Sequence, residues 1–278
     1  MPDPAGLAFK AYEIEELADI YFFRPCGMVL ARLARALGLT PTAVTGIGAL
    51  AGVAGGTLLH DDRFGMAAFG FIILHGILDS SDGQLARMTG QTSEYGRILD
   101  GVGGYLTHAA IYLGILAGAL GRGADGSLVA IALAAAAANI VQAQMYDYHR
   151  TAYARLVLEG SGVVESLRDG RPFLLRAYQA AQRALSGLHP HVEAEMARRS
   201  IGGVVRDGDR ARYRSCFYWP VRGWNLMGDN TRFYAIGVLA WLHRLDAFFL
   251  FLLVPMNVAC VALWWWQARA DRRFLAGL

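Results

Sequence analysis

Cysteine is scarce in this sequence, which contains only 3 cysteines among 278 residues. Their number is odd, and Cys26, Cys216 and Cys260 lack the short paired spacing of a zinc site. We therefore expect free thiols and neither a disulfide framework nor a zinc centre. The sequence also lacks a Walker loop, a nucleophile elbow and a His-Glu-x-x-His element, which argues against the enzyme classes that depend on them.

Charge is also limited, since 18% of the residues are charged and the formal net charge is +3. No nucleic-acid-binding motif is present, and a modest positive charge suits a membrane surface with anionic lipid better than nucleic acid. The N-terminus lacks a basic region followed by an apolar core and a cleavage site, so we expect no removable signal peptide.

Apolar residues are abundant, at 55% of the chain, and the mean hydropathy is +0.31. A soluble helical bundle would show a polar face on each helix, but the long apolar runs of this chain show almost none. Several runs approach the roughly 20 residues that a helix needs to cross a bilayer, and the second and fifth need flanking helix. We predict an all-α integral membrane protein with six transmembrane helices, at residues 42–59, 64–78, 102–120, 128–145, 233–242 and 247–266.

The basic residues predict the orientation of these helices. If the first span leaves the cytoplasm after Pro41, nearly all the arginines fall on the cytoplasmic side, and only Arg63, Arg122 and Arg244 fall on the other. Both chain ends and the Asp79 to Asp100 segment would then face the cytoplasm, at the cell inner (cytoplasmic) membrane.

Four regions follow from the pattern of apolar and polar segments. The first, 1–40, carries an amphipathic helix from Ile20 to Leu39 that we expect to lie in the membrane interface. Spans one to four occupy 41–145. A cytoplasmic helical insertion is predicted at 146–232, and 233–278 contains the last two spans and a tail.

Three aspartates stand near the cytoplasmic end of the second span. Asp79 and Asp82 are three residues apart and share one face of a helix, and Asp100 can join them from a neighbouring helix. Three oxygen ligands suit a hard divalent cation, Mg²⁺ or Mn²⁺. Such an ion can hold a diphosphate and neutralise the charge on its leaving group.

Small and basic residues accompany these aspartates. Gly83 and Ala86 lack bulk, Arg87 can bind phosphate oxygens, and Gly96 leaves room at the start of the third span. Arg232 closes an aromatic-rich segment, 219–232, directly before a span. That segment is either an interfacial belt or a surface that faces the acceptor or a phosphate.

The order D-x-x-D-G-x-x-A-R, eight residues and G-x-x-x-D resembles the signature of the CDP-alcohol phosphotransferase family of membrane enzymes in phospholipid synthesis. The resemblance implies a CDP-linked lipid donor, commonly CDP-diacylglycerol, an alcohol acceptor, release of CMP and often a homodimer. It also implies that Asp79, Asp82 and Asp100 bind the metal. Thr45, in the Pro-Thr segment that opens the first span, would lie near the nucleotide.

The sequence departs from the family pattern at its last position. The pattern would place a fourth aspartate, the usual proton acceptor, at Gly104. His108 lies one turn further on the same face and is a candidate substitute base, although a histidine satisfied by packing is the alternative. Asp147, His149 and Asp229 are further candidates.

Three hypotheses of function remain open from the sequence. The first is a transferase with an altered or relocated base. The second is a catalytically silent homologue that binds CDP-lipid or metal as a regulatory or assembly subunit. The third is a lipid carrier or other transporter, for which the sequence offers only its spans.

Overall fold

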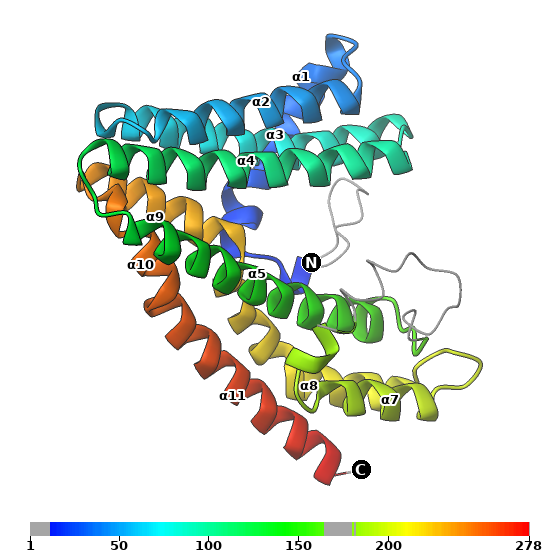
Figure 1. Cartoon of the computed structure of the whole chain (residues 1–278). Helices are drawn as coiled ribbons and strands as arrows, with labels where there is room; N and C mark the ends of the chain where they lie inside the picture. The colour runs from blue at the N-terminus through cyan, green and yellow to red at the C-terminus, as the bar shows by residue number, and fades with distance from the viewer. Residues whose placement is uncertain (1–11, 164–179, 181, 278) are drawn as a thin grey trace. The chain divides into compact units, whose positions relative to one another are not determined.

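The computed structural model describes residues 12–163, 180 and 182–277, and within these residues all regular elements are helical (Figure 1). The chain is an all-α integral membrane protein, as the sequence predicts. Among the described residues, five helical segments are long and apolar enough to cross a membrane. They are Pro41–Leu58, Asp62–Thr89, Glu94–Gly121, Ser127–Leu158 and Leu245–Ala276. The first is helix α2, and the third is helix α4. The second contains a short 3₁₀ turn and α3 (Gly65–Thr89), the fourth contains α5 (Ser127–Tyr153) and a π-helical turn, and the fifth contains α10 (Phe248–Leu253) and α11 (Pro255–Ala276).

The predicted fifth span falls in a helix that is short for a crossing. Helix α9 runs over Asp229–Trp241, which is 13 residues. At about 1.5 Å per residue such a helix extends over roughly 20 Å, whereas the hydrocarbon core is about 30 Å thick. The total of six crossings therefore stays a prediction.

The chain divides into two compact units, which are described separately. Among the described residues, the first unit contains 17–136 and 229–253. The second contains 12–16, 137–163, 180, 182–228 and 254–277. Helix α5 contributes to both.

In the first unit, α2 packs against both α3 and α4. Glycines make the contact with α4 close, because a Cβ atom on Gly114 would lie 2.0 Å from the carbonyl oxygen of Gly56. A Cβ on Gly52 would likewise lie 2.2 Å from the hydroxyl oxygen of Thr107. Such small residues allow membrane helices to approach through their backbones.

Local capping sets where these helices begin and end. Helix α2 starts after Thr40, whose hydroxyl accepts a hydrogen bond from the Ala43 amide, and has Pro41 in its first turn. Helix α3 ends at Gly90, which has a φ of 68° that favours glycine. After a short turn, Ser93 caps α4 by accepting from the Gly96 amide at 2.9 Å.

Helix α1 (Arg24–Ala36) corresponds to the predicted amphipathic helix and follows a π-turn at Asp19–Phe23. It packs on α3 through a buried face that includes Ala31 and Ala34. Val29 and Leu33 are exposed on the remaining surface. An interfacial position agrees with these exposed apolar residues and stays a prediction.

In the second unit, the predicted insertion contains α7 (His189–Arg199) and α8 (Asp207–Trp224), both packed on α11. Its first residues continue α5 and the π-turn Ala154–Leu158. The predicted helical stretch near 174–188 lies partly outside the described residues. The buried His189 ring joins the helices, with Nδ1 2.8 Å from the Asp271 carboxylate and Nε2 2.8 Å from the Tyr213 hydroxyl.

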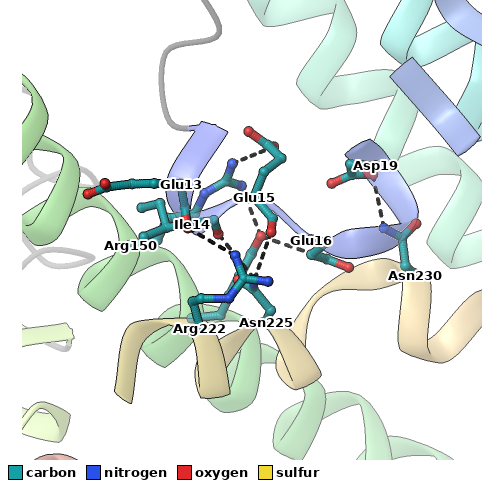
Figure 2. A network of polar contacts seen from close by, with 10 residues as sticks. Glu13, Ile14, Glu15, Glu16, Asp19, Arg150, Arg222, Asn225 and Asn230 are labelled. Carbon is teal, nitrogen blue, oxygen red and sulfur yellow. Dashed lines mark hydrogen bonds and ion pairs between the residues drawn. The ribbon is translucent and has the colours of Figure 1, made fainter. Parts of the chain in front are cut away.

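An acidic segment near the N-terminus is fixed within the second unit (Figure 2). Arg150 donates to the buried Glu15 carboxylate at 2.6 Å, and Arg222 donates to the backbone carbonyl of Glu13 at 2.9 Å. Asn225 donates to the carbonyl of Ile14 at 3.1 Å. Arginines from α5 and α8 therefore donate hydrogen bonds to the carboxylate and backbone oxygens of this segment.

The glycine contact between α2 and α4 predicts a steric effect on stability. Gly114→Ala would place a methyl group against the Gly56 carbonyl and force the helices apart. We expect a loss of about 1–3 kcal/mol in the free energy of unfolding. Gly121→Ala is the matched control in the same helix, because a Cβ there meets nothing within 4 Å. Thermal unfolding in detergent should separate the two variants, and an equal loss in both would contradict the packing argument.

Candidate functional site

The three predicted metal ligands line one pocket in the first unit. Asp79 and Asp82 come from α3, and Asp100 comes from the second turn of α4. Helix α2 packs against both of these helices and contributes the remaining wall. The pocket is lined by Thr45, Gly48, Ala49, His75, Asp79, Asp82, Asp100 and Gly103.

Asp82 is the most enclosed of the three, with a relative exposure of 7%. The hydroxyl of Thr45 donates to Asp82 Oδ2 at 2.5 Å and also lies 3.0 Å from the carbonyl of Pro41. A short O–H···O contact to a carboxylate is typical of a charge-assisted hydrogen bond. Thr45 therefore positions Asp82, whereas its predicted contact with substrate stays a prediction.

The other two carboxyl groups are more accessible. Asp79 is exposed and Asp100 is half-buried. The helices are close around them, since a Cβ on Gly48 would lie 3.2 Å from Leu78 and a Cβ on Gly103 would lie 3.1 Å from Ala49. Three carboxyl groups from two helices thus line a single pocket.

These three carboxylates have the chemistry of ligands for a divalent ion, but their side chains are not arranged around a common point. Carboxylate oxygens are the ligands that Mg²⁺ and Mn²⁺ prefer. Within the described part of the chain, however, no three His, Cys, Asp or Glu side chains are placed so that they could hold a metal ion. The ligand role of Asp79, Asp82 and Asp100 would therefore require their side chains to turn toward a common point.

His75 also lines the pocket, one turn before Asp79. Its Nδ1 lies 3.0 Å from the carbonyl oxygen of Gly48. A carbonyl only accepts, so the hydrogen bond assigns the proton to Nδ1. The sequence carries a signal for this neighbour in its i, i+4 spacing from Asp79.

The predicted nucleotide-contacting residues follow the aspartates but do not line this pocket. A Cβ on Gly83 would be in van der Waals contact with the guanidinium group of Arg87, at 3.5 Å. Arg87 is exposed and Ala86 is half-buried. Gly96 donates its amide to Ser93, which gives it a role in capping α4.

A second polar group in the same unit contains His108, the predicted substitute base. Its Nδ1 lies 2.9 Å from the carbonyl oxygen of Gly104, and its Nε2 lies 3.3 Å from Asp229 Oδ1. Arg232 is buried, with Nη1 4.0 Å from the same carboxylate oxygen. The ring of Phe233 lies between the two histidines, with centroids 6.4 Å from His75 and 6.1 Å from His108.

Comparison with known proteins identifies the segment that carries the pocket. The sequence profile of the CDP-alcohol phosphatidyltransferase family matches residues 38–156. The match includes α2, α3, α4 and α5, and it confirms the resemblance found in the signature. No curated protein and no solved structure matches the chain.

The Thr45 hydroxyl predicts a measurable effect on stability. Thr45→Val keeps the shape of the side chain but removes the donor to the buried Asp82 carboxyl group. We expect a loss of about 1–3 kcal/mol in the free energy of unfolding, the usual cost of removing the partner of a buried polar group. Thr45→Ser keeps the hydroxyl and should remain near the wild-type value. Identical thermal unfolding of the valine and serine variants would show that the contact contributes nothing.

Proposed function

Because residues 38–156 match the sequence profile of the CDP-alcohol phosphatidyltransferase family, we propose that the protein transfers a phosphatidyl or other substituted phosphate group from a CDP-linked donor to an alcohol, in phospholipid biosynthesis. CDP-diacylglycerol is the first choice of donor. The observation that carries the proposal is the pocket in which three aspartates of the family signature meet. The signature residues come from two helices, so their meeting is a property of the fold as well as of the sequence.

In the proposed reaction, the alcohol oxygen attacks the phosphorus that carries the lipid. The bond between that phosphorus and the bridging oxygen breaks, and CMP leaves with the electron pair. Asp79, Asp82 and Asp100 would hold a divalent ion, Mg²⁺ or Mn²⁺. When bound, such an ion supplies positive charge to the diphosphate and its leaving group.

The remaining predicted residues would bind the donor. Gly83, Ala86 and Gly96 leave space for the nucleotide near the backbone, and the exposed Arg87 can donate to phosphate oxygens. Arg232 is buried, so it would favour binding of the negatively charged donor through the electric field of its positive charge. Thr45 keeps the Asp82 carboxyl group in place.

The membrane position suits such a donor. The apolar helices place the chain in a membrane, where a diacylglycerol-linked substrate also resides. We propose that the pocket faces the cytoplasm, on the side where the arginine-rich segments are predicted.

The activity predicts acceptor-dependent release of CMP. The full-length protein in detergent should release CMP from radiolabelled CDP-diacylglycerol when Mg²⁺ or Mn²⁺ and an acceptor are present, and EDTA should stop the release. The acceptor panel contains serine, polyol phosphates and lipid alcohols. Stabilisation by the donor without any CMP would instead indicate a silent binding subunit. Movement of lipid across vesicles without CMP would indicate a carrier.

The proposed ligand set makes a separate prediction for binding. Asp82→Asn should weaken the binding of Mn²⁺ and of CDP together, by at least about 10- to 100-fold, the loss that changes to residues merely supporting a metal site can cause. Asp207→Asn, at an exposed aspartate in the other unit, is the control and should bind as wild type. Calorimetric titration measures both ligands. Unchanged affinity of Asp82→Asn for both would refute the ligand assignment.

A further inference from the structure

The transfer reaction requires a group that accepts the proton of the alcohol, and the signature offers only glycine at position 104. We propose that Asp229 is this proton acceptor and that His108 is the residue that positions it. The inference rests on the proposed function and names a catalytic residue outside the signature and outside the 38–156 segment.

His108 has no free nitrogen in this structure. Its Nδ1 is bound to the backbone carbonyl of Gly104, and its Nε2 faces the carboxylate of Asp229. A ring that donates from Nδ1 to this carbonyl and from Nε2 to this carboxylate is protonated on both nitrogens. Such an imidazolium has no lone pair to offer to the proton of the alcohol. The ring is therefore arranged to hold the carboxylate and not to replace it.

Asp229 retains the capacity that His108 lacks. Its contact with His108 uses Oδ1, and 57% of its side chain is exposed, whereas the exposure of the His108 side chain is 26%. Arg232 Nη1 lies 4.0 Å from the same oxygen, so both contacts of the carboxylate involve Oδ1. A carboxylate has about four lone-pair sites, and those of Oδ2 leave room for the hydroxyl of an acceptor.

The position of Asp229 follows from three contacts within the first unit. His108 is anchored on Gly104, the residue where a Cβ would meet nothing within 4 Å, so the space beside that backbone position is open. Helix α9, which begins at Asp229, packs on α3. Phe233, on the same helix, packs its ring near both His75 of the pocket and His108, with centroid distances of 6.4 and 6.1 Å.

Other candidate bases are less suitable. Asp147 accepts a hydrogen bond from Gln182 at 3.1 Å, and His149 is fully buried against Trp224 at 5.0 Å between ring centroids. Both belong to the second unit, whereas Asp229 belongs to the unit that contains the pocket. The alternative to a catalytic role for Asp229 is a structural one, because an acidic residue in the first turn of α9 stabilises the start of that helix.

The proposed step is balanced in atoms and electrons. The O–H bond of the alcohol breaks as its proton moves to an oxygen of Asp229, and the alcohol oxygen forms a bond to phosphorus. The bond from phosphorus to the bridging oxygen breaks, and CMP leaves with that electron pair. Asp229 then releases the proton to water.

The test separates proton transfer from binding. In the full-length protein, Asp229→Asn should lower the rate of CMP release from CDP-diacylglycerol by about 100-fold or more, the usual contribution of a positioned base. Stabilisation by the donor, measured by thermal unfolding over a range of CDP-diacylglycerol concentrations, should be unchanged. Asp246→Asn is the control, because Asp246 is an exposed aspartate of the same unit that pairs with Arg244. It should retain both properties.

Two further variants test the assigned roles. His108→Gln keeps an N–H group toward Asp229, so a positioning role predicts a rate within about tenfold of wild type, whereas a histidine base predicts the loss typical of a missing base. Gly104→Asp combined with Asp229→Asn puts a carboxylate into the open space at position 104. This double variant should release CMP at least about tenfold faster than Asp229→Asn alone, a recovered part of the usual contribution of a base.

The outcomes distinguish the inference from the proposed function. A wild-type rate in Asp229→Asn, or an equal loss of rate and donor binding, would overturn the role of Asp229 and leave the transferase activity in place. A loss of rate in His108→Gln as large as in Asp229→Asn would assign the base to His108 instead. Failure of the wild-type protein to release CMP with any acceptor would overturn the transferase activity and this inference with it.

Discussion

The site depends on the cost of bringing acidic side chains together at the end of membrane helices. Charges at such positions are expensive unless they have partners. Asp82 is the most enclosed of the three acidic residues, and its carboxyl group accepts a hydrogen bond from the hydroxyl of Thr45. Asp79 is exposed and Asp100 is half-buried, and both line the same pocket. Three carboxyl groups that line one pocket would be stabilised by a cationic ligand, which is the role that we propose for a divalent ion.

The glycine contacts of α2 make this arrangement possible. Helix α2 brings Thr45 to Asp82 and, through Gly56, lies close against α4, which carries Asp100. A larger residue in that contact would move Asp100 relative to the two aspartates of α3. The small residues that pack the membrane helices therefore also determine the dimensions of the site, and stability and function are coupled through one helix.

Local patterns predicted most of the framework. Five of the six predicted apolar runs correspond to helical segments that are long and apolar enough to cross a membrane in the described part of the chain. Asp79, Asp82 and Asp100 line one pocket, as their spacing predicts, because helical periodicity is a pattern of nearby residues. The run at 233–242 was too short to establish a crossing, and the structure gives a 13-residue helix there. The contacts Thr45–Asp82 and His108–Asp229 join residues 37 and 121 positions apart, and no periodic signal connects such distant residues.

The contact between His108 and Asp229 matters for interpreting Gly104, which stands where the family signature has an aspartate. Catalysis requires a proton acceptor near the reacting alcohol, and a residue from a different helix can provide it. Gly104 has no side chain, but its backbone carbonyl contacts His108, and His108 in turn contacts a carboxylate at the start of α9. The same carboxylate lies 4.0 Å from the buried Arg232, so it has a structural partner in addition to the catalytic role that we propose. Relocation of the base to Asp229 is our inference, and it depends on the proposed transferase activity.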